Sequence, residues 1–513
     1  MSEGNATLVF GLNRSGSGAV SLLTALGEKA FIYDDNEKAI RKFPVEENVV
    51  VLSGGCATAF SQGIRTAVVS PGIPPDNKAL QSLKAQGIKI ISEVELAFLY
   101  CKAPIVAVTG TNGKSSAVTI IHTLLEHEGY TSYLAGNIGV PFSAVVAAAI
   151  RGEIEVPDWY VLEVSSYQLA LTTAFKPRIA VYTGYAPDHL DWHGSEEAYV
   201  EAKVSIASRL EKGDTLIFPE NSGIMGEALC EICKNLKASV IVLKDLSMDS
   251  DGMNDDSTIE EVDPGHRGYS CNPSVIALAS DSGELLFKGQ SYNLYKLLKD
   301  VIFSPSLVSC AIHAALGTAA AMGMNMAAIV RGLSEFTPLE HRLEDLGSIG
   351  SVRFINDSKA TNIDATSYAL RMCSGPVVLL LGGRDKGSSY KELLPVVTPS
   401  LKVIVAFGEA KDKIVADLTG IVPLREADSF GDALAIALKE ASFLTLPVTG
   451  AMPSILLSPA CSSFDEFANF EERGRAFKRW VSDLKKENHL LLQLDDCDVA
   501  LLKLDDTDSG DSK

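Results

Sequence analysis

The stretch Ile105-Val-Ala-Val-Thr-Gly-Thr-Asn-Gly-Lys114-Ser115 decides the fold of this chain. Its first five residues predict a buried strand, and residues 116–129 have the spacing of an amphipathic helix. A glycine-rich loop between a strand and a helix presents successive backbone N–H groups, which suit a phosphate. Lys114 can neutralise that phosphate, and the Ser115 hydroxyl can ligate Mg²⁺. Val108 replaces the first glycine of the usual pattern, so we interpret the loop as a shorter variant.

A similar unit opens the chain. A short apolar strand precedes the glycine-rich turn Gly11–Gly18, and a second strand ends in Asp34 and Asp35. Alone, such a turn is compatible with a dinucleotide, with another nucleotide, or with no ligand. The turn at residues 70–73 follows a later strand, where open parallel sheets place their ligand loops. The first hundred residues therefore predict an α/β domain.

Polar residues also follow the predicted strands beyond the phosphate loop. Glu163 ends one strand, where its carboxylate suits Mg²⁺ better than an isolated surface charge would. The run Asp188-His-Leu-Asp-Trp-His193 has two carboxylates and two imidazoles, which favours a cation site or proton handling over a solvated loop. Lys203 lies in the next predicted helix, and its spacing alone gives no reason to single it out.

A third block of strands follows Pro338 and carries three polar turns, at residues 356–362, 382–387 and 458–474. The first two each contain a lysine that can reach an anionic group. The hydroxyls and N-terminal amides of the third can bind a carboxylate, or they can simply cap a helix.

Composition excludes several classes of protein. Hydrophobic residues make up 46% and charged residues 21% of the 513, and the net charge of −20 argues against a nucleic-acid or anionic-membrane surface. Nine irregularly placed cysteines do not form a disulfide framework, and Cys230 and Cys233 lack partners for a zinc site. We find no signal peptide and no run of transmembrane length. The sequence predicts a cytoplasmic protein that binds no nucleic acid and no membrane.

The order of these elements predicts an α/β protein with three domains. We expect a Rossmann-like N-terminal domain, a central P-loop ATPase α/β domain and a C-terminal Rossmann-like α/β domain. The expected bounds are 1–102, 103–337 with a polar surface insertion at about 246–270, 338–484, and an acidic tail at 485–513.

Seven motifs together resemble the Mur ligase family. They are GTNGKS, EVSSYQL, DHLDWH, HRLE, NDSKATN, GGRDKG and LLSPACSSFDEFANFEERG, and their order and separation match the family between about residues 7 and 480. The resemblance implies an ATP-dependent amide ligase of peptidoglycan precursor synthesis. The last motif is similar to that of members that add D-glutamate to UDP-N-acetylmuramoyl-L-alanine through an acyl phosphate.

The resemblance assigns roles to particular residues. It implies that the UDP precursor is bound by Ser15, Gly16, Asp34, Asp35, Ser70, Pro71, Gly72 and Ile73. It places ATP on Gly110, Thr111, Asn112, Gly113, Lys114, Ser115, Ser116, Arg342, Asp357 and Lys359. It implies two Mg²⁺ ions on Ser115, Glu163, His189 and Lys203, the last as N6-carboxylysine. Catalytic roles fall to Lys114, Asn137, His189 and Lys203, and D-glutamate contacts to Thr361, Lys386, Ser463 and Phe470.

Some features depart from the family pattern and leave alternatives open. Residues 304–311 replace a His-Asn…Asn element that family members carry before the alanine-rich helix. One alternative is a Mur ligase with another amino-acid acceptor, and a second is a non-catalytic relative that binds a nucleotide or precursor. Folylpolyglutamate synthetases share the loop, but they begin near it, so the domain ahead of residue 103 disfavours them. We expect a monomer.

Overall fold

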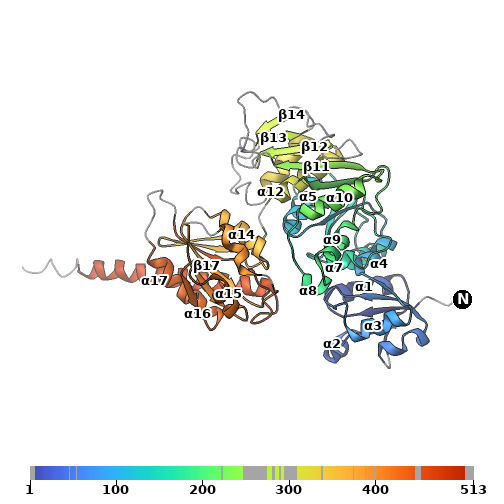
Figure 1. Cartoon of the computed structure of the whole chain (residues 1–513), viewed down its shortest axis with the longest axis horizontal. Helices are drawn as coiled ribbons and strands as arrows, with labels where there is room; N and C mark the ends of the chain where they lie inside the picture. Colours follow the sequence, from blue (N-terminus) through green and yellow to red (C-terminus); the bar gives the residue numbers. More distant parts are fainter. Residues whose placement is uncertain are drawn as a thin grey trace, which may run out of the picture. The chain divides into compact units, whose positions relative to one another are not determined.

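The computed structural model describes residues 6–44, 47–52, 55–220, 223–245, 274–279, 284–287, 290–293, 309–336, 339–373, 375–387, 389–396, 400–444 and 452–502. The chain forms two compact units, Met1–Thr337 and Pro338–Lys513, which we describe separately (Figure 1). The insertion expected at 246–270, residues 304–308 and the end of the expected tail, 503–513, lie outside the described residues.

The first unit begins with a five-stranded parallel sheet in the order β3-β2-β1-β4-β5. Its strands are β1 (Ala6–Phe10), β2 (Ala30–Tyr33), β3 (Val49–Val51), β4 (Ile64–Val69) and β5 (Lys89–Ile91). Separate hydrophobic clusters cover its two faces, as a parallel sheet requires. The strand order reverses between β1 and β4, so the loops after these strands flank the crevice where such sheets bind ligands.

The second sheet of this unit has nine strands, in the order β14-β13-β12-β11-β10-β9-β6-β8-β7. Its parallel strands are β6 (Ile105–Thr109), β7 (Ser132–Gly136), β8 (Trp159–Glu163), β9 (Ile179–Tyr182), β10 (Thr215–Pro219), β11 (Ser239–Asp245) and β12 (Ser274–Ala279). The antiparallel strands β13 (Glu284–Phe287) and β14 (Gln290–Asn293) complete one edge.

Helices cover both faces of this central sheet. One cluster joins it to α5 (Lys114–Glu128), α12 (Ser309–Met322) and α13 (Met326–Glu335). The cluster on the other face is continuous with the first sheet, because it includes α1 (Arg14–Ala25), α4 (Glu93–Tyr100) and α6 (Phe142–Ile150). The first two sheets therefore share one hydrophobic core.

The second unit contains a six-stranded sheet, in the order β15-β16-β20-β17-β18-β19. The strands are β15 (Glu344–Ile349), β16 (Val352–Asn356), β17 (Val377–Gly382), β18 (Leu401–Phe407), β19 (Leu424–Glu426) and β20 (Ser454–Leu457). All pairs are parallel except β15 with β16. Three doubly covered, mainly parallel sheets confirm the predicted α/β class.

The last helix, α17, runs from Phe470 to Leu502. The expected boundary at 484 falls inside this helix, so helical structure continues into the segment assigned to the acidic tail. That segment mixes charged residues with several leucines, so its composition suits a helix as well as a tail.

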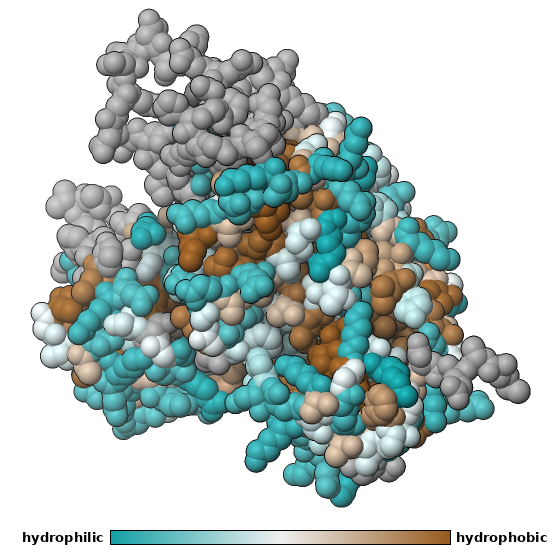
Figure 2. Space-filling model, turned by 45° about the vertical axis from the view of Figure 1, so that its right-hand side comes forward, coloured by the Kyte–Doolittle hydropathy of each residue, from teal (hydrophilic) through white to brown (hydrophobic). Residues whose placement is uncertain are grey.

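On the face shown in Figure 2, hydrophobic side chains form separate patches among hydrophilic ones. The exposed large hydrophobic residues lie on several different elements and include Phe60, Leu99, Val140, Phe443 and Phe464. Within the described ranges, no helix has both the length and the hydropathy needed to span a membrane.

Candidate active site

The central candidate residues lie at the carboxyl ends of four adjacent strands, in the order β9-β6-β8-β7. The phosphate loop follows β6, Glu163 is the last residue of β8, and Asn137 comes directly after β7. The loop that leads to His189 follows β9. Because parallel strands end at the same edge of a sheet, the fold brings together residues that are about 80 positions apart in sequence.

Close packing around Gly110 fixes the shape of the phosphate loop. Gly110 has a φ of 139°, and a Cβ there would lie 2.1 Å from Thr183 Oγ1, so only glycine fits. The Thr183 hydroxyl donates a 2.5 Å hydrogen bond to the Asn112 carbonyl. Gly113, in the left-handed region, precedes α5, so that the helix begins at Lys114 with its N-terminus at the loop.

Two lysines converge on this loop. Lys114 Nζ donates 2.7 Å hydrogen bonds to the carbonyls of Gly110 and Thr111. Lys203 Nζ, from α9 (Glu196–Val204), donates to the same Gly110 carbonyl at 2.7 Å. The side chain of Lys203 is buried, at 2% exposure. The arrangement concentrates positive charge where an anion would bind.

Burial changes the chemistry of Lys203. Loss of solvation lowers the pKa of its amine well below the ordinary value, and the Lys114 ammonium lowers it further. The carboxylates of Asp188 and Glu163 oppose this change. The lowered pKa increases the fraction of neutral amine at Lys203, the form that reacts as a nucleophile.

Glu163, at the end of β8, and Ser115, in the first turn of α5, follow neighbouring positions of the sheet edge. Both are buried, at 3% and 1% exposure. The Asn137 amide donates a 2.7 Å hydrogen bond to Glu163 Oε1, and its backbone N–H donates to the Glu163 carbonyl at 2.8 Å. Glu163 therefore holds the turn after β7 at the carboxyl end of β8.

His189 has a positive φ of 57° and lies in an aromatic cluster. Its ring centroid is 4.8 Å from that of Tyr167, and its Nε2 is 3.4 Å from Asp188 Oδ2. His193 stacks on Tyr167 and makes a 2.9 Å hydrogen bond to the Ser166 hydroxyl. The two imidazoles therefore differ in their partners: His193 makes a hydrogen bond with a serine hydroxyl, whereas His189 lies beside a carboxylate.

The described residues could hold the two Mg²⁺ ions implied by the resemblance only if substrate phosphates and water supplied the remaining ligands. Nowhere in the described ranges do three or more His, Cys, Asp or Glu side chains form a preassembled metal cluster. Mg²⁺ usually takes one or two protein oxygens and completes its shell with water and substrate phosphates. Ser115 and Glu163 match that requirement, because each can supply one oxygen. The two lysines at the loop could bind the phosphates that supply the others.

In the first sheet, the predicted precursor-binding residues follow β1, β2 and β4. Asp34 accepts hydrogen bonds from the backbone N–H groups of Leu12 and Asn36, each at 2.8 Å, so its carboxylate shapes the glycine turn. A Cβ on Gly16 would lie 1.8 Å from the Gly11 carbonyl oxygen. The Ser70 hydroxyl donates to that carbonyl at 2.9 Å, which joins the turns after β1 and β4.

The second unit repeats the pattern at the ends of β16, β20 and β17, which are adjacent. Asp357, directly after β16, accepts hydrogen bonds from the Ser458 hydroxyl at 2.8 Å and from Leu343 N–H at 3.2 Å. Burial raises the pKa of its carboxyl to about 7, against the effect of these hydrogen bonds and of Arg342. Arg342 Nε is buried and donates no hydrogen bond within the described ranges, which suits contact with a ligand.

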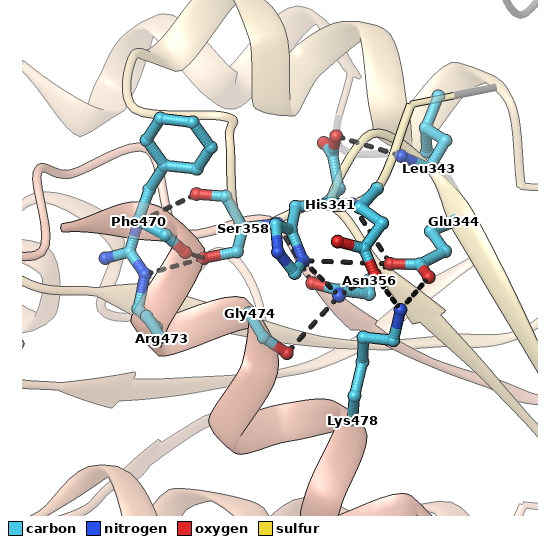
Figure 3. A network of polar contacts seen from close by, with 11 residues as sticks. His341, Leu343, Glu344, Asn356, Ser358, Phe470, Arg473, Gly474 and Lys478 are labelled. Carbon is cyan, nitrogen blue, oxygen red and sulfur yellow. Dashed lines mark hydrogen bonds and ion pairs between the residues drawn. The ribbon is translucent and has the colours of Figure 1, made fainter. Parts of the chain in front are cut away.

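Figure 3 shows the network that holds this region to α17. Asn356 Nδ2 donates to His341 Nδ1 at 2.8 Å and to Glu344 Oε2 at 3.0 Å. Lys478 of α17 forms an ion pair with Glu344, and a Cβ on Gly474 would lie 2.3 Å from the His341 ring. This packing holds His341 at a φ of 65°.

Arg473 anchors the same helix from within the protein. It has no exposed surface, and its guanidinium donates to Ser358 Oγ at 3.0 Å and to the Ser358 carbonyl at 2.9 Å (Figure 3). It also donates to the Cys461 carbonyl at 3.1 Å. Burial lowers its pKa to about 10. The cation therefore ties together the turns after β16 and β20.

The expected D-glutamate residues occupy these turns. Ser463 is buried at 2% exposure, Phe470 begins α17, and Thr361 and Lys386 are half-buried. Lys359 Nζ lies 5.5 Å from the Phe470 ring centroid. Thr361, Lys386 and Ser463 belong to loops at one edge of the third sheet, and Phe470 follows the last of these loops as the first residue of α17.

Sequence reasoning missed three contributors. The Tyr199 hydroxyl makes a 2.9 Å hydrogen bond to Thr111 Oγ1, and its ring lies 4.8 Å from Lys203 Nζ. The four-residue spacing of Tyr199 and Lys203 on a helix was the available signal. Thr183 and Arg473 carried no such signal, because their contacts are formed by the tertiary structure.

Asp357 should make stability depend on pH. Its folded pKa of about 7 exceeds the value of about 4 in an unfolded chain, so the native state keeps a proton that the unfolded state releases. We expect the free energy of unfolding of the wild type to fall, relative to Asp357→Asn, as the pH rises from about 4 to about 7. Nucleotide-free denaturant titrations would measure this difference, and parallel pH profiles would contradict it.

Comparison with known proteins identifies the family. The model of the Mur ligase MurD-like N-terminal domain matches residues 5–92, and that of the Mur ligase middle domain matches residues 108–263. A UDP-N-acetylmuramoylalanine–D-glutamate ligase of Chlorobaculum parvum is 34% identical, over 94% of this chain and 98% of the relative. The enzyme of the same name from Pelodictyon phaeoclathratiforme is 33% identical, over 94% and 99%.

A solved structure has the same fold. A MurF ligase from Thermotoga maritima in complex with ADP superposes with a TM-score of 0.53 at 13% identity, over 94% of this chain and 96% of that one. Together with the relatives, which span nearly the whole chain, these matches agree with the motifs at the strand ends. The chain therefore belongs to the Mur ligase family, and within it to the MurD-type ligases.

Proposed function

We propose that this protein is an ATP-dependent ligase that joins D-glutamate to UDP-N-acetylmuramoyl-L-alanine in peptidoglycan precursor synthesis. The observation that supports this most strongly is the group at adjacent strand ends, namely a phosphate loop, a buried carboxylate and a buried lysine. Relatives that bear the name of this activity are 34% and 33% identical to the chain.

The phosphate loop supplies the site for ATP. Lys114, which bonds loop carbonyls in this structure, would turn its ammonium toward the phosphates. The N–H groups of Gly113, Lys114 and Ser115 lie at the start of α5 and would contribute further hydrogen bonds. Arg342, Asp357 and Lys359 are the proposed contacts in the second unit.

Lys203 is the proposed site of N6-carboxylysine. A neutral amine can attack CO₂ and release a proton to form a carbamate, which gives the uncharged side chain a negative charge. The low pKa of Lys203 favours this reaction, and the adjacent Lys114 ammonium would stabilise the product. The modified side chain, with Ser115, Glu163 and His189, would hold the two Mg²⁺ ions.

The reaction then proceeds in two steps. The γ-phosphoryl group passes to the L-alanine carboxylate, giving ADP and an acyl phosphate. The D-glutamate amine attacks the carbonyl carbon, loses a proton and expels phosphate. Bound Mg²⁺ would offset the charge on the transferred oxygens. Asn137, held by Glu163, is positioned to hydrogen-bond the reacting carboxyl group.

The remaining assignments concern substrates and location. The first turn of α1 at Ser15–Gly16 and the loops at Asp34–Asp35 and Ser70–Ile73 would bind the UDP precursor. D-Glutamate would be bound by Thr361, Lys386, Ser463 and Phe470. ATP and UDP-linked precursors are cytoplasmic metabolites, so we assign the protein to the cytoplasm. We propose a monomer, because each unit carries its own complete core.

Phosphate release from ATP tests the function. With Mg²⁺ and UDP-N-acetylmuramoyl-L-alanine, we expect release to require D-glutamate, since the acyl phosphate needs that amine. L-Glutamate and a diamino acid are the matched acceptors and should give background rates. Release with a diamino acid instead would indicate a different Mur ligase, and no release with any acceptor would favour the non-catalytic relative.

Lys203 gives a second test. We expect Lys203→Ala to lower kcat by more than the roughly 10–100-fold typical of outer-shell metal-site changes. Removal of CO₂ should lower wild-type activity and bicarbonate should restore it, whereas bicarbonate should not rescue Lys203→Ala, which has no amine to modify. Near-normal turnover by the variant would exclude the assigned role.

A further inference from the structure

Three helices meet where the first sheet joins the central sheet. α1 follows the glycine turn, α4 leads from β5 toward β6, and α6 follows the turn that carries Asn137. The approach of α1 to α6 is close, because a Cβ on Gly18 would lie 2.6 Å from Ser143 Oγ and 2.8 Å from Pro141 Cβ. Leu22, Val94 and Phe142 belong to one continuous core here.

Glu93 places a carboxylate inside this joint. It is the first residue of α4 and is only 2% exposed. Its Oε1 accepts a 2.5 Å hydrogen bond from the backbone N–H of Ser143, in the first turn of α6. Glu93 Oε2 and Ser143 Oγ are both buried, and within the described ranges neither atom bonds to a residue outside this pair. Burial raises the pKa of the Glu93 carboxyl.

The neighbouring Glu95 shows what a purely structural carboxylate looks like in the same helix. It accepts hydrogen bonds from Thr173 Oγ1 at 2.6 Å and from the N–H groups of Ala174 and Phe175 at 2.7 and 2.9 Å. Both of its oxygens are used. Glu93, by contrast, directs its carboxylate at a single residue of α6, and the Ser143 groups offset only part of the cost of its burial.

That bond fixes one end of the Asn137 turn. The other end is held at the central sheet, where Gly136 N–H donates to the Val140 carbonyl and Asn137 N–H to the Glu163 carbonyl. Ser143 lies six residues after Asn137, and Gly18 packs against it from the helix of the glycine turn. The carboxylate therefore holds the residue of α6 against which the helix of Gly18 packs.

We propose that Glu93 is a positioning residue for the UDP precursor: it holds the α6 N-terminus so that the glycine turn and the Asn137 turn engage opposite ends of one substrate molecule. This inference rests on the proposed function. The uridine diphosphate end would be bound by the first sheet alone, whereas the reacting carboxyl must reach Asn137. A displacement of about 1 Å between such groups can cost about 100-fold in rate.

Three variants test the proposal. Glu93→Ala removes the acceptor for the Ser143 N–H, Glu93→Gln keeps an acceptor in nearly the same shape, and Val94→Ala is a matched control that removes buried apolar volume from the same helix. For each variant we would measure the melting temperature and the KM for ATP. Calorimetry would give its affinity for UDP and for UDP-N-acetylmuramoyl-L-alanine.

For Glu93→Ala we expect unchanged affinity for UDP, about 10-fold weaker precursor binding, lower kcat and unchanged KM for ATP. Glu93→Gln should stay within about threefold of wild type, and Val94→Ala should lower the melting temperature without weakening precursor binding. The inference would be overturned if Glu93→Ala lost affinity for UDP and for the precursor equally, or if it behaved like Val94→Ala. Normal turnover by the wild type would then leave the proposed function intact. A wild type that does not bind the precursor would overturn both.

Discussion

The geometry of parallel strands is the constraint on which the rest of this structure depends. Every parallel strand of a sheet ends at the same edge, so loops that are distant in sequence meet there. The central sheet uses this to collect the phosphate loop, Glu163 and Asn137, and the third sheet uses it to collect Asp357 and Ser463. Glycines at 110 and 113 then let the phosphate loop turn tightly enough for α5 to begin at Lys114.

The central site brings two lysine side chains together, and an anionic ligand would neutralise their charge. Lys114 and Lys203 share the Gly110 carbonyl, an arrangement in which each ammonium raises the electrostatic cost of the other. A phosphate group would relieve that cost, and so would conversion of Lys203 to a carbamate. Buried polar groups that are costly in the free protein are a common feature of sites organised around a ligand.

Much of this could be predicted from the sequence. The strand-loop-helix pattern around Lys114 and the polar turns after Glu163, Asn356 and Leu457 predicted both the α/β class and the edge of each sheet that carries polar groups. Lys203 could not be found this way, because a lysine in a helix ordinarily points into water, and only the resemblance singled it out. Thr183 and Arg473 act through contacts that form only in the folded protein. The acidic residues after 484 predicted a tail, although the segment is helical as far as Leu502.

The most direct measurement of the central claim is a crystal structure of the protein with ADP, Mg²⁺ and UDP-N-acetylmuramoyl-L-alanine. We expect phosphates on residues 110–115, metal beside Ser115 and Glu163, and added density for a carbamate on Lys203. Phosphates bound elsewhere, or an unmodified Lys203 still bonded to the Gly110 carbonyl beside the bound nucleotide, would contradict it.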